Sequence, residues 1–215
     1  MATSLSQHLQ WSAASLPLHG QTEIGDCFVV KFFDSQALVA VVDGVGHGEE
    51  AAAAARLAVA ILEKYDGQRP LTGLLEECHE KLRGSRGAVI SLALLNGNNG
   101  TLTWMGVGNI EGLLLRGSAG GQAAPGRVQE SLLLRAGVLG HVLPRLAVST
   151  MPLAGNDLLV FVTDGIRPEF AIGIHGDLSV QSIAHDILDR YALETDDALV
   201  LVVRYADEHN SPARR

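Results

Sequence analysis

The sequence predicts an α+β domain in which helices pack on the outside of β-sheets. Short apolar strand candidates, separated by turn dipeptides such as Asn-Gly, alternate with segments of helical periodicity. A chain of 215 residues can bury most of the surface that its unfolded form exposes, so a large core is expected. No repeat and no linker interrupts the pattern, and we therefore expect one domain over residues 1–206 and a disordered tail over 207–215.

The composition excludes several classes of partner. With 47% hydrophobic and 19% charged residues the chain is too apolar to be disordered, yet apolar runs such as 37–42 and 158–162 are far too short to cross a membrane. A net charge of -8 argues against nucleic acid, whose binding depends on clustered Lys and Arg. Two cysteines and a first segment without signal-peptide features favour a cytoplasmic protein.

The first half of the chain begins with a strand hairpin and continues with two helices. Residues 26–30 and 37–42 are apolar runs on either side of a short turn, which is typical of two paired, buried strands. Alanines and larger apolar residues recur at helical spacing over 49–65, and leucines repeat this spacing over 71–82. The second helix follows the first directly, with no strand between them.

The spacing of apolar residues then changes to that of strands. Short candidates divided by glycine-containing turns predict an antiparallel meander over residues 88–95, 102–107, 113–116 and 128–134. A fully apolar strand over 158–163 precedes a helix over 180–191, whose first turn Ser179 can cap. A last buried strand covers residues 198–203.

Acidic residues lie at the ends of these strands. Asp26 opens the first strand, Asp43 closes the second, Asp164 closes a later one, and Asp196 with Asp197 opens the last. If the strands lie side by side in two packed sheets, these carboxylates gather at one edge. Clustered carboxylates repel one another unless they are protonated or bridged by cations, and an oxygen-only ligand set favours Mg²⁺ or Mn²⁺.

The glycines after Asp43 allow a different interpretation. In a dinucleotide-binding loop, Gly44, Gly46 and Gly48 would approach a pyrophosphate at the start of a helix. That fingerprint needs its third glycine three residues after the second, and a strand after the helix. Here the glycine spacing is different and a second helix follows, so the sequence does not fit a dinucleotide site.

Each acidic residue and the nearby histidine also have a purely structural interpretation. Asp-Gly is an ordinary turn dipeptide, so Asp43 or Asp164 taken singly can be a turn residue, and the case for a site depends on the whole set. His47 could act as a catalytic acid, brace the glycine loop or simply begin the helix, and we favour the brace. The sequence has no Gly-x-Ser-x-Gly motif around a nucleophilic serine, which argues against hydrolysis through a covalent serine intermediate.

The motifs around these residues resemble, in order, those of the PPM superfamily of metal-dependent protein Ser/Thr phosphatases (type 2C), in its bacterial SpoIIE-like branch. The resemblance spans residues 24–205 and is carried by Gly25-Asp26, Val42-Asp43-Gly44-Val45-Gly46-His47-Gly48, Phe161-Val162-Thr163-Asp164-Gly165-Ile166 and Thr195-Asp196-Asp197-Ala198. Arg86-Gly87-Ala88 and the segment 106–112 make the chain similar to the stressosome feedback phosphatases of that branch. The resemblance implies a four-layer α-β-β-α sandwich, with two antiparallel sheets flanked by helix pairs.

The resemblance also implies a role for each site residue. The ligands of two Mn²⁺ or Mg²⁺ ions would be Asp26, Asp43, the carbonyl of Gly44, Asp164 and Asp196. Asp43 would bridge the two ions and so act in catalysis. Asp197 stands where many relatives have Asn and is a further candidate ligand beside Asp196. The leaving oxygen would take its proton from a water or from His47.

The implied activity is that of a phosphoserine/phosphothreonine phosphatase, which acts on phosphorylated STAS-domain proteins of the stressosome by direct attack of a metal-bound water. We expect a monomer that binds neither nucleic acid nor membrane. Two other functions stay open, a catalytically weak binding module of this fold and a hydrolase of small phosphate esters. The chain lacks a clear phosphate-binding Arg near its start and has little room for a flap, so we expect a folded substrate and an adjustable surface over 112–126.

Overall fold

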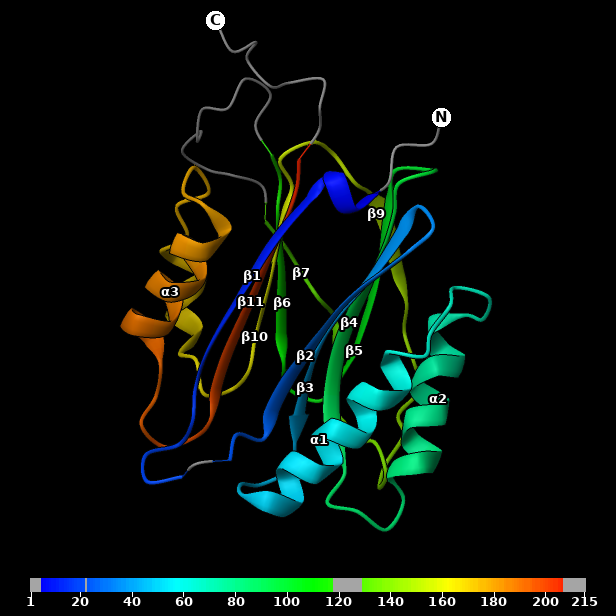
Figure 1. The fold of residues 1–215 in the computed structure, drawn as a ribbon, viewed down its shortest axis with the longest axis vertical. Helices are drawn as coiled ribbons and strands as arrows, with labels where there is room; N and C mark the ends of the chain where they lie inside the picture. Colours follow the sequence, from blue (N-terminus) through cyan, green and yellow to red (C-terminus); the bar gives the residue numbers. More distant parts are fainter. Residues whose placement is uncertain (1–4, 22, 118–128, 207–215) are drawn as a thin grey trace, which may run out of the picture.

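The computed structural model describes residues 5–21, 23–117 and 129–206 as two facing β-sheets with helices on their outer faces (Figure 1). The expected tail over 207–215 and the larger part of the expected adjustable surface, residues 118–126, lie outside the described residues. No helix in the described ranges is long and apolar enough to span a membrane.

Five strands form one sheet, called sheet A here, in the order β1-β11-β10-β6-β7. The bounds of these strands are Leu9–Leu16 for β1, Ala198–Tyr205 for β11, Leu158–Val162 for β10, Glu111–Leu115 for β6 and Gln129–Ser131 for β7. All pairs in sheet A are antiparallel, and β1 pairs with β11 from Leu9 opposite Tyr205 to Leu16 opposite Ala198.

The other sheet, sheet B, has six strands in the order β2-β3-β4-β5-β8, with β9 also paired to β5. Its strands are Asp26–Phe33 for β2, Gln36–Gly44 for β3, Ala88–Asn96 for β4, Thr101–Val107 for β5, Leu134–Arg135 for β8 and Ser149–Pro152 for β9. The short β8 runs parallel to β5, and the other pairs in the sheet are antiparallel.

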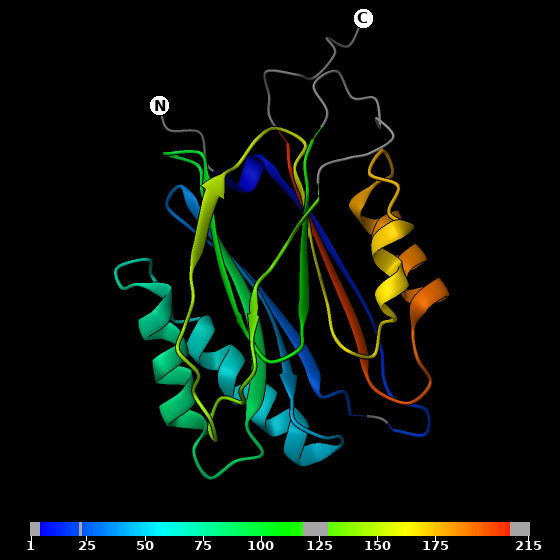
Figure 2. The same ribbon diagram turned by 180° about the vertical axis from the view of Figure 1, so that it is seen from behind.

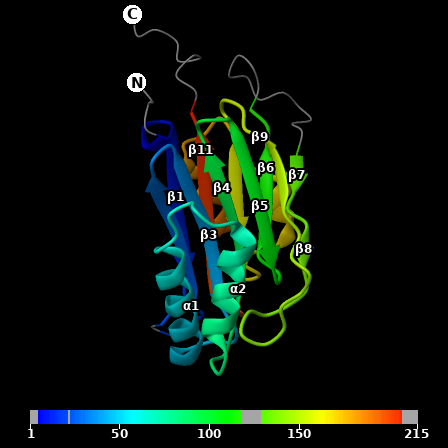
Figure 3. The same cartoon turned by 90° about the vertical axis from the view of Figure 1, so that its right-hand side faces the viewer.

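Helices cover the outer face of each sheet, as the views from behind and from the side show (Figures 2 and 3). The pair α1 (Glu49–Leu62) and α2 (Leu71–Leu82) packs on sheet B. Sheet A is covered by α3 (Val180–Tyr191) and the short 3-10 helix η2 (Pro168–Ile172), and another 3-10 helix, η1 (Leu5–Gln7), precedes β1. The α+β class and the four layers are therefore as expected, except that a 3-10 helix takes the place of a second α-helix on sheet A.

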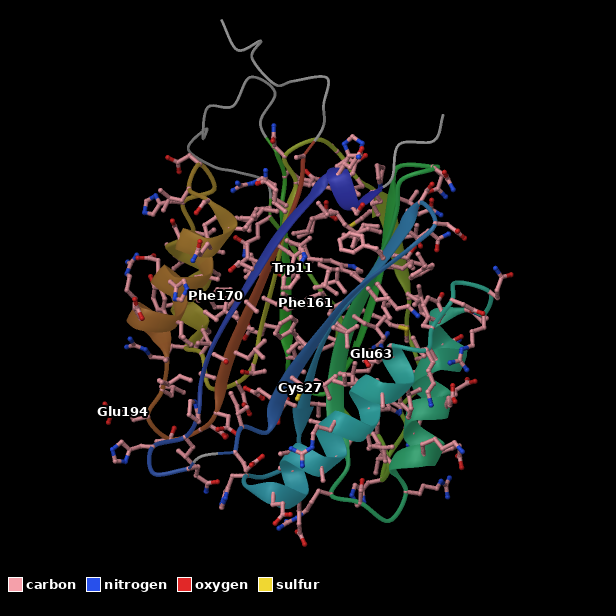
Figure 4. All side chains as sticks on the ribbon, in the orientation of Figure 1. Trp11, Cys27, Glu63, Phe161, Phe170 and Glu194 are labelled. Carbon is pink, nitrogen blue, oxygen red and sulfur yellow. The ribbon has the colours of Figure 1, made fainter. Side chains whose placement is uncertain are left out.

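The core has three parts because each sheet is buried on both faces. Trp104 and Phe161 belong to the cluster between the sheets, whereas Phe170 packs with α3 on the outer face of sheet A. Figure 4 shows Phe161 in the centre and Phe170 on the side of α3. The continuous apolar run of β3 follows from this arrangement, because alternate residues face the other sheet and the helices α1 and α2.

The elements agree closely with the sequence, apart from the meander. The two helices of the first half and the helix α3 lie where their spacing predicts them, and Ser179 Oγ caps α3 by accepting from the backbone N–H of Ser182 at 3.1 Å. The expected meander is wrong, because the chain leaves sheet B after β5 and enters sheet A as β6. The strand expected over 128–134 is broken into β7 and β8, which belong to different sheets.

Candidate metal centre

Two carboxylates face each other at one end of sheet B. Asp26 begins β2 and Asp43 lies near the end of β3, and the two residues are direct partners in the antiparallel ladder. Directly opposite residues in such a ladder have Cβ atoms roughly 5 Å apart, so the two side chains lie within reach of one cation. The tight turn of this hairpin lies at the other end of the strands, and the carboxylates therefore lie at the end that leads into α1.

Asp26 is joined to sheet A by a buried hydrogen bond. The hydroxyl of Thr163, at the end of β10, donates to Asp26 Oδ2 at 2.8 Å and accepts from the backbone N–H of Leu199 at 2.9 Å. Asp26 is 3% exposed and Thr163 is 1% exposed. A hydrogen bond to a buried carboxylate fixes its rotamer, so Thr163 orients Asp26 and links the two sheets at this edge.

Asp196 and Asp197, which directly precede β11, differ in their hydrogen bonds. Asp197 accepts the backbone N–H of Leu18 on Oδ1 at 2.7 Å and that of Gly25 on Oδ2 at 2.6 Å. Both oxygens of Asp197 therefore hold the chain that leads into β2. Asp196 is half-buried, and its Oδ1 accepts a local hydrogen bond from the backbone N–H of Asp197 at 2.9 Å.

Asp164 follows β10 and is exposed at the same edge. The side-chain amide of Asn109, in the turn between β5 and β6, donates to Asp164 Oδ2 at 2.7 Å. This turn carries the chain from sheet B into sheet A, so the bond again joins the two sheets. Asn109 therefore fixes one oxygen of Asp164.

Two glycines allow the backbone to close tightly around the acidic edge. A Cβ atom on Gly44 would lie 2.0 Å from the carbonyl oxygen of Ala51 in α1, and a Cβ on Gly165 would lie 2.0 Å from the carbonyl oxygen of Asp197. The backbone N–H of Gly44 also donates to the carbonyl of Gly25 at 3.2 Å. Only glycine permits these approaches, which bring the residues next to Asp43 and Asp164 against neighbouring segments.

Burial and mutual repulsion change the acidity of the cluster. Burial is the main cause that raises the pKa of Asp26 to about 7, and the charges of Asp197, Asp164 and Asp196 add to it. Burial also raises the pKa of Asp43 to about 8, with further contributions from Asp26 and the other three. The pKa of Asp164 is raised by burial and by Asp196, while the bond from Asn109 opposes the rise. Cations that neutralise the cluster would release these protons near neutral pH.

The chemistry of the donor set fits hard divalent cations. The side chains at this edge offer carboxylate oxygens from different strands, and neither thiol nor imidazole lies among them, which suits Mg²⁺ or Mn²⁺. In the part of the chain that the structure describes, no three His, Cys, Asp or Glu side chains already close around one point. The carboxylates are nevertheless near enough to raise one another's pKa.

The raised pKa values predict an unusual dependence of stability on pH. Without metal, Asp43 and Asp26 stay protonated in the folded state at pH values at which they ionise in the unfolded chain. The unfolded state then binds fewer protons, so the free energy of unfolding should fall as pH rises from about 4 to about 8. In the Asp43→Asn variant, we expect this decrease in the free energy of unfolding to be smaller by on the order of 2 kcal/mol. Each unit of pKa shift corresponds to about 1.4 kcal/mol, and structural relaxation around the charged group reduces the full effect.

Urea unfolding in chelator at pH 5.5 and 8.5 measures this effect. The wild type should lose more stability between the two pH values than the Asp43→Asn variant does. Equal losses in the two proteins would contradict the assignment of the raised pKa to Asp43.

The structure brings most of the sequence-predicted residues together. Four strand ends, from both sheets, contribute Asp26, Asp43, Asp164, Asp196 and Asp197. His47 lies outside this set, because it is exposed on the loop before α1, where its Nδ1 accepts from Gln21 Nε2 at 3.1 Å. His47 thus contacts the side chain of Gln21.

Sequence reasoning missed two residues that orient the carboxylates. Thr163 directly precedes Asp164, and Asn109 lies in a Gly-Asn turn, yet neither residue received a role. In the sequence, the only signal for either residue is its position inside a segment that resembles the phosphatase family. Their partners are 137 and 55 residues away, so the contacts depend on the packing of the two sheets.

Comparisons of the sequence place the chain among known proteins. The family model described as Stage II sporulation protein E (SpoIIE) matches residues 34–206. The phosphoserine phosphatase RsbX of Bacillus subtilis (strain 168) is 28% identical over 109 residues, which are 51% of this chain and 54% of RsbX. The match thus spans about half the length of that relative.

Solved structures share the fold over nearly the whole chain. A chain from a structure of the bacterial stressosome, described as a modular system adapted to control secondary messenger signaling, is 30% identical with a TM-score of 0.79 and covers 91% of this chain and 99% of its own. The crystal structure of RsbX in complex with magnesium is 22% identical with a TM-score of 0.80, over 93% of this chain and 96% of RsbX. The expected fold is thereby confirmed, and because the family model extends from the β2–β3 turn past the end of β11, the chain belongs to the SpoIIE family.

Proposed function

We propose that this protein is a metal-dependent phosphatase that acts on phosphoserine or phosphothreonine in other proteins. The observation that carries the proposal is the convergence of Asp26, Asp43, Asp164 and Asp196 from four strand ends at one edge of the sandwich. Such a cluster by itself repels a phosphate ester, and only bound cations make the edge attractive to one. The resemblance to RsbX, which is named as a phosphoserine phosphatase, supports the same activity.

We assign two ions, Mn²⁺ or Mg²⁺, to this edge. Asp43 would serve both ions, and the backbone carbonyl of Gly44 would bind one of them. Asp26 would serve one ion, and Asp164 with Asp196 would hold the other. When bound, the cations supply positive charge for the phosphoryl oxygens and lower the pKa of a nucleophilic water. Magnesium in the crystal structure of RsbX supports the class of ion.

The chain's own residues then orient and stabilise the site. Thr163 holds Asp26, and Asn109 holds Asp164, so one oxygen of each carboxylate is fixed. Asp197, with both oxygens occupied by backbone N–H groups, is a positioning residue in this proposal rather than a ligand. His47 is the chain's candidate to donate the proton to the leaving serine or threonine oxygen, if its bond to Gln21 opens.

We further propose phosphorylated STAS-domain proteins of the stressosome as the substrates. The likeness to RsbX and to a chain from a stressosome structure supports this choice. Free thiols at Cys27 and Cys78 are consistent with the reducing cytoplasm. A monomer is part of the same proposal.

Hydrolysis of an aryl phosphate and of a phosphorylated STAS-domain protein tests the proposal. We expect turnover of both substrates with Mn²⁺ or Mg²⁺, loss of turnover in chelator, and recovery when metal is restored. A binding module would hydrolyse neither substrate, and a hydrolase of small esters would hydrolyse the aryl phosphate alone. Equal rates with and without chelator, after verified metal removal, would show that the reaction does not need the acidic edge.

A further inference from the structure

A hollow of about 600 Å³ lies between the end of β8 and the segment that leads to β9. Two arginines, Arg135 and Arg145, line it together with Pro144, Leu146 and Val148. Both arginines are exposed, and Val148 is 45% exposed, so the surface presents charge and apolar area side by side. A hollow of this volume accommodates several side chains rather than a single small anion.

The segment that forms one wall of the hollow, residues 136–148, is fixed to the rest of the protein. Leu139 exchanges two backbone hydrogen bonds with Ala88 at the start of β4, and the N–H of Gly140 donates to His79 Nδ1 in α2 at 3.1 Å. The ring of His141 contacts the carbonyl of Arg86 at 3.0 Å. Figure 2 shows this part of the chain, between β8 and β9, beside the lower end of α2. The hollow is therefore held in shape before any partner binds.

The two arginines differ from the other arginines of the described ranges. Each of those donates to a carboxylate or to a backbone carbonyl, as in the pairs of Arg86 with Glu50 and of Arg116 with Asp157. Within the same ranges, the side chains of Arg135 and Arg145 have no hydrogen-bonded or ion-paired partner. Their guanidinium groups remain free to pair with carboxylates of another molecule.

The hollow begins beside the acidic edge. The carbonyl of Arg135 accepts the backbone N–H of Gly108 at 2.9 Å, and the next residue, Asn109, is bonded to Asp164. A protein that presents a phosphorylated side chain to Asp164 and Asp43 would therefore place the surface around its phosphosite over Arg135 and Arg145.

We propose that this hollow docks an acidic surface of the folded phosphoprotein substrate, so that carboxylates flanking the phosphosite pair with Arg135 and Arg145. The inference rests on the proposed phosphatase function. Charge complementarity supports an acidic partner, because the chain as a whole carries -8 and would repel such a surface elsewhere. Pro144, Leu146 and Val148 offer the apolar contacts that surround charged pairs in protein interfaces.

The test compares Arg145→Glu with the wild type on two substrates. With a phosphorylated STAS-domain protein, we expect kcat/KM to fall at least about tenfold, mainly through a rise in KM, because remote binding is lost while the chemistry is unchanged. With an aryl phosphate, which is too small to reach the hollow, kcat and KM should stay at wild-type values. Arg135→Glu should have the same pattern, and Arg145→Lys should recover most of the loss.

Lys64→Glu is the matched control, because it reverses one exposed charge beyond the end of α1, away from the acidic edge. It should leave both substrates unaffected. Direct binding of the phosphoprotein in chelator, measured by fluorescence anisotropy, should weaken in Arg145→Glu but not in Lys64→Glu. This measurement judges docking without turnover, so a failure of the phosphatase proposal can be told apart from a failure of the docking proposal.

Two results would overturn the docking proposal. Unchanged binding and kinetics on the phosphoprotein would mean that the hollow takes no part in recognition. An equal loss on the phosphoprotein and on the aryl phosphate would mean that the arginines act on the phosphoryl group itself.

Discussion

Asp43→Asn is expected to lower kcat for metal-dependent phosphate-ester hydrolysis by at least about a thousandfold. Asp43 faces Asp26 across the β2–β3 ladder, and the charges of four neighbouring aspartates act on it. An amide keeps the shape of the side chain but removes the negative charge that would be shared by two cations. The loss should appear in kcat on the aryl phosphate and on the phosphoprotein alike.

Two measurements separate loss of chemistry from loss of structure. Titration calorimetry with Mn²⁺ should show weaker or fewer binding events in Asp43→Asn, while its unfolding in chelator should be cooperative. Asp34→Asn is the control, because Asp34 lies in the β2–β3 turn with φ 50, a conformation that Asn adopts readily. Wild-type rates with a normal metal requirement in Asp43→Asn would mean that the catalytic site is elsewhere.

Gly165→Ala should destabilise the fold by on the order of 3 kcal/mol, which corresponds to a drop in Tm of roughly 10 °C for a chain of this size. The new Cβ would lie 2.0 Å from the carbonyl oxygen of Asp197, so one of the two backbone segments must move. Movement of Asp197 would loosen the bonds that it accepts from Leu18 and Gly25. The variant should therefore also bind Mn²⁺ more weakly.

Gly73→Ala provides the matched comparison for this substitution. Gly73 lies inside α2, and the atom nearest to its added Cβ is 3.9 Å away. Because alanine is the better helix former, we expect this variant to gain about 0.5–1 kcal/mol of stability. Thermal unfolding of the two variants measures both effects, and a Gly165→Ala protein as stable as the wild type would refute the close packing at the acidic edge.

Local patterns were sufficient to predict much of this fold. The helix over Leu71–Leu82 has the bounds that leucine spacing gives, and the hairpin of β2 and β3 follows from two apolar runs and a short turn. Strand ends were equally predictable, because Asp43 and Asp164 directly follow runs of buried residues. The acidic edge could therefore be inferred once the strands were assumed to lie side by side.

Contacts between distant segments could not be predicted in this way. The strand β1 has few large apolar residues and lies at the edge of sheet A, so its sequence gives only a weak signal. The turn at Asn109 resembles a hairpin turn, although it carries the chain into the other sheet. The positioning role of Asp197 likewise depends on its hydrogen bond with the backbone N–H of Leu18, which is 179 residues away.

The pairing of β1 with β11 has a consequence for the order of folding. The strands β2, β3, β4 and β5 of sheet B pair with neighbours in the sequence, whereas β1 must wait for the last strand of the domain. Because closing a long loop costs entropy before any contact forms, we expect sheet B to form first and sheet A to be completed last. Thr163 and Asp197 lie next to strands of sheet A, yet they hold Asp26 at the start of β2 and Gly25 just before it. A nascent or partly opened chain would thus lack an assembled acidic edge and could not yet bind the proposed metal ions.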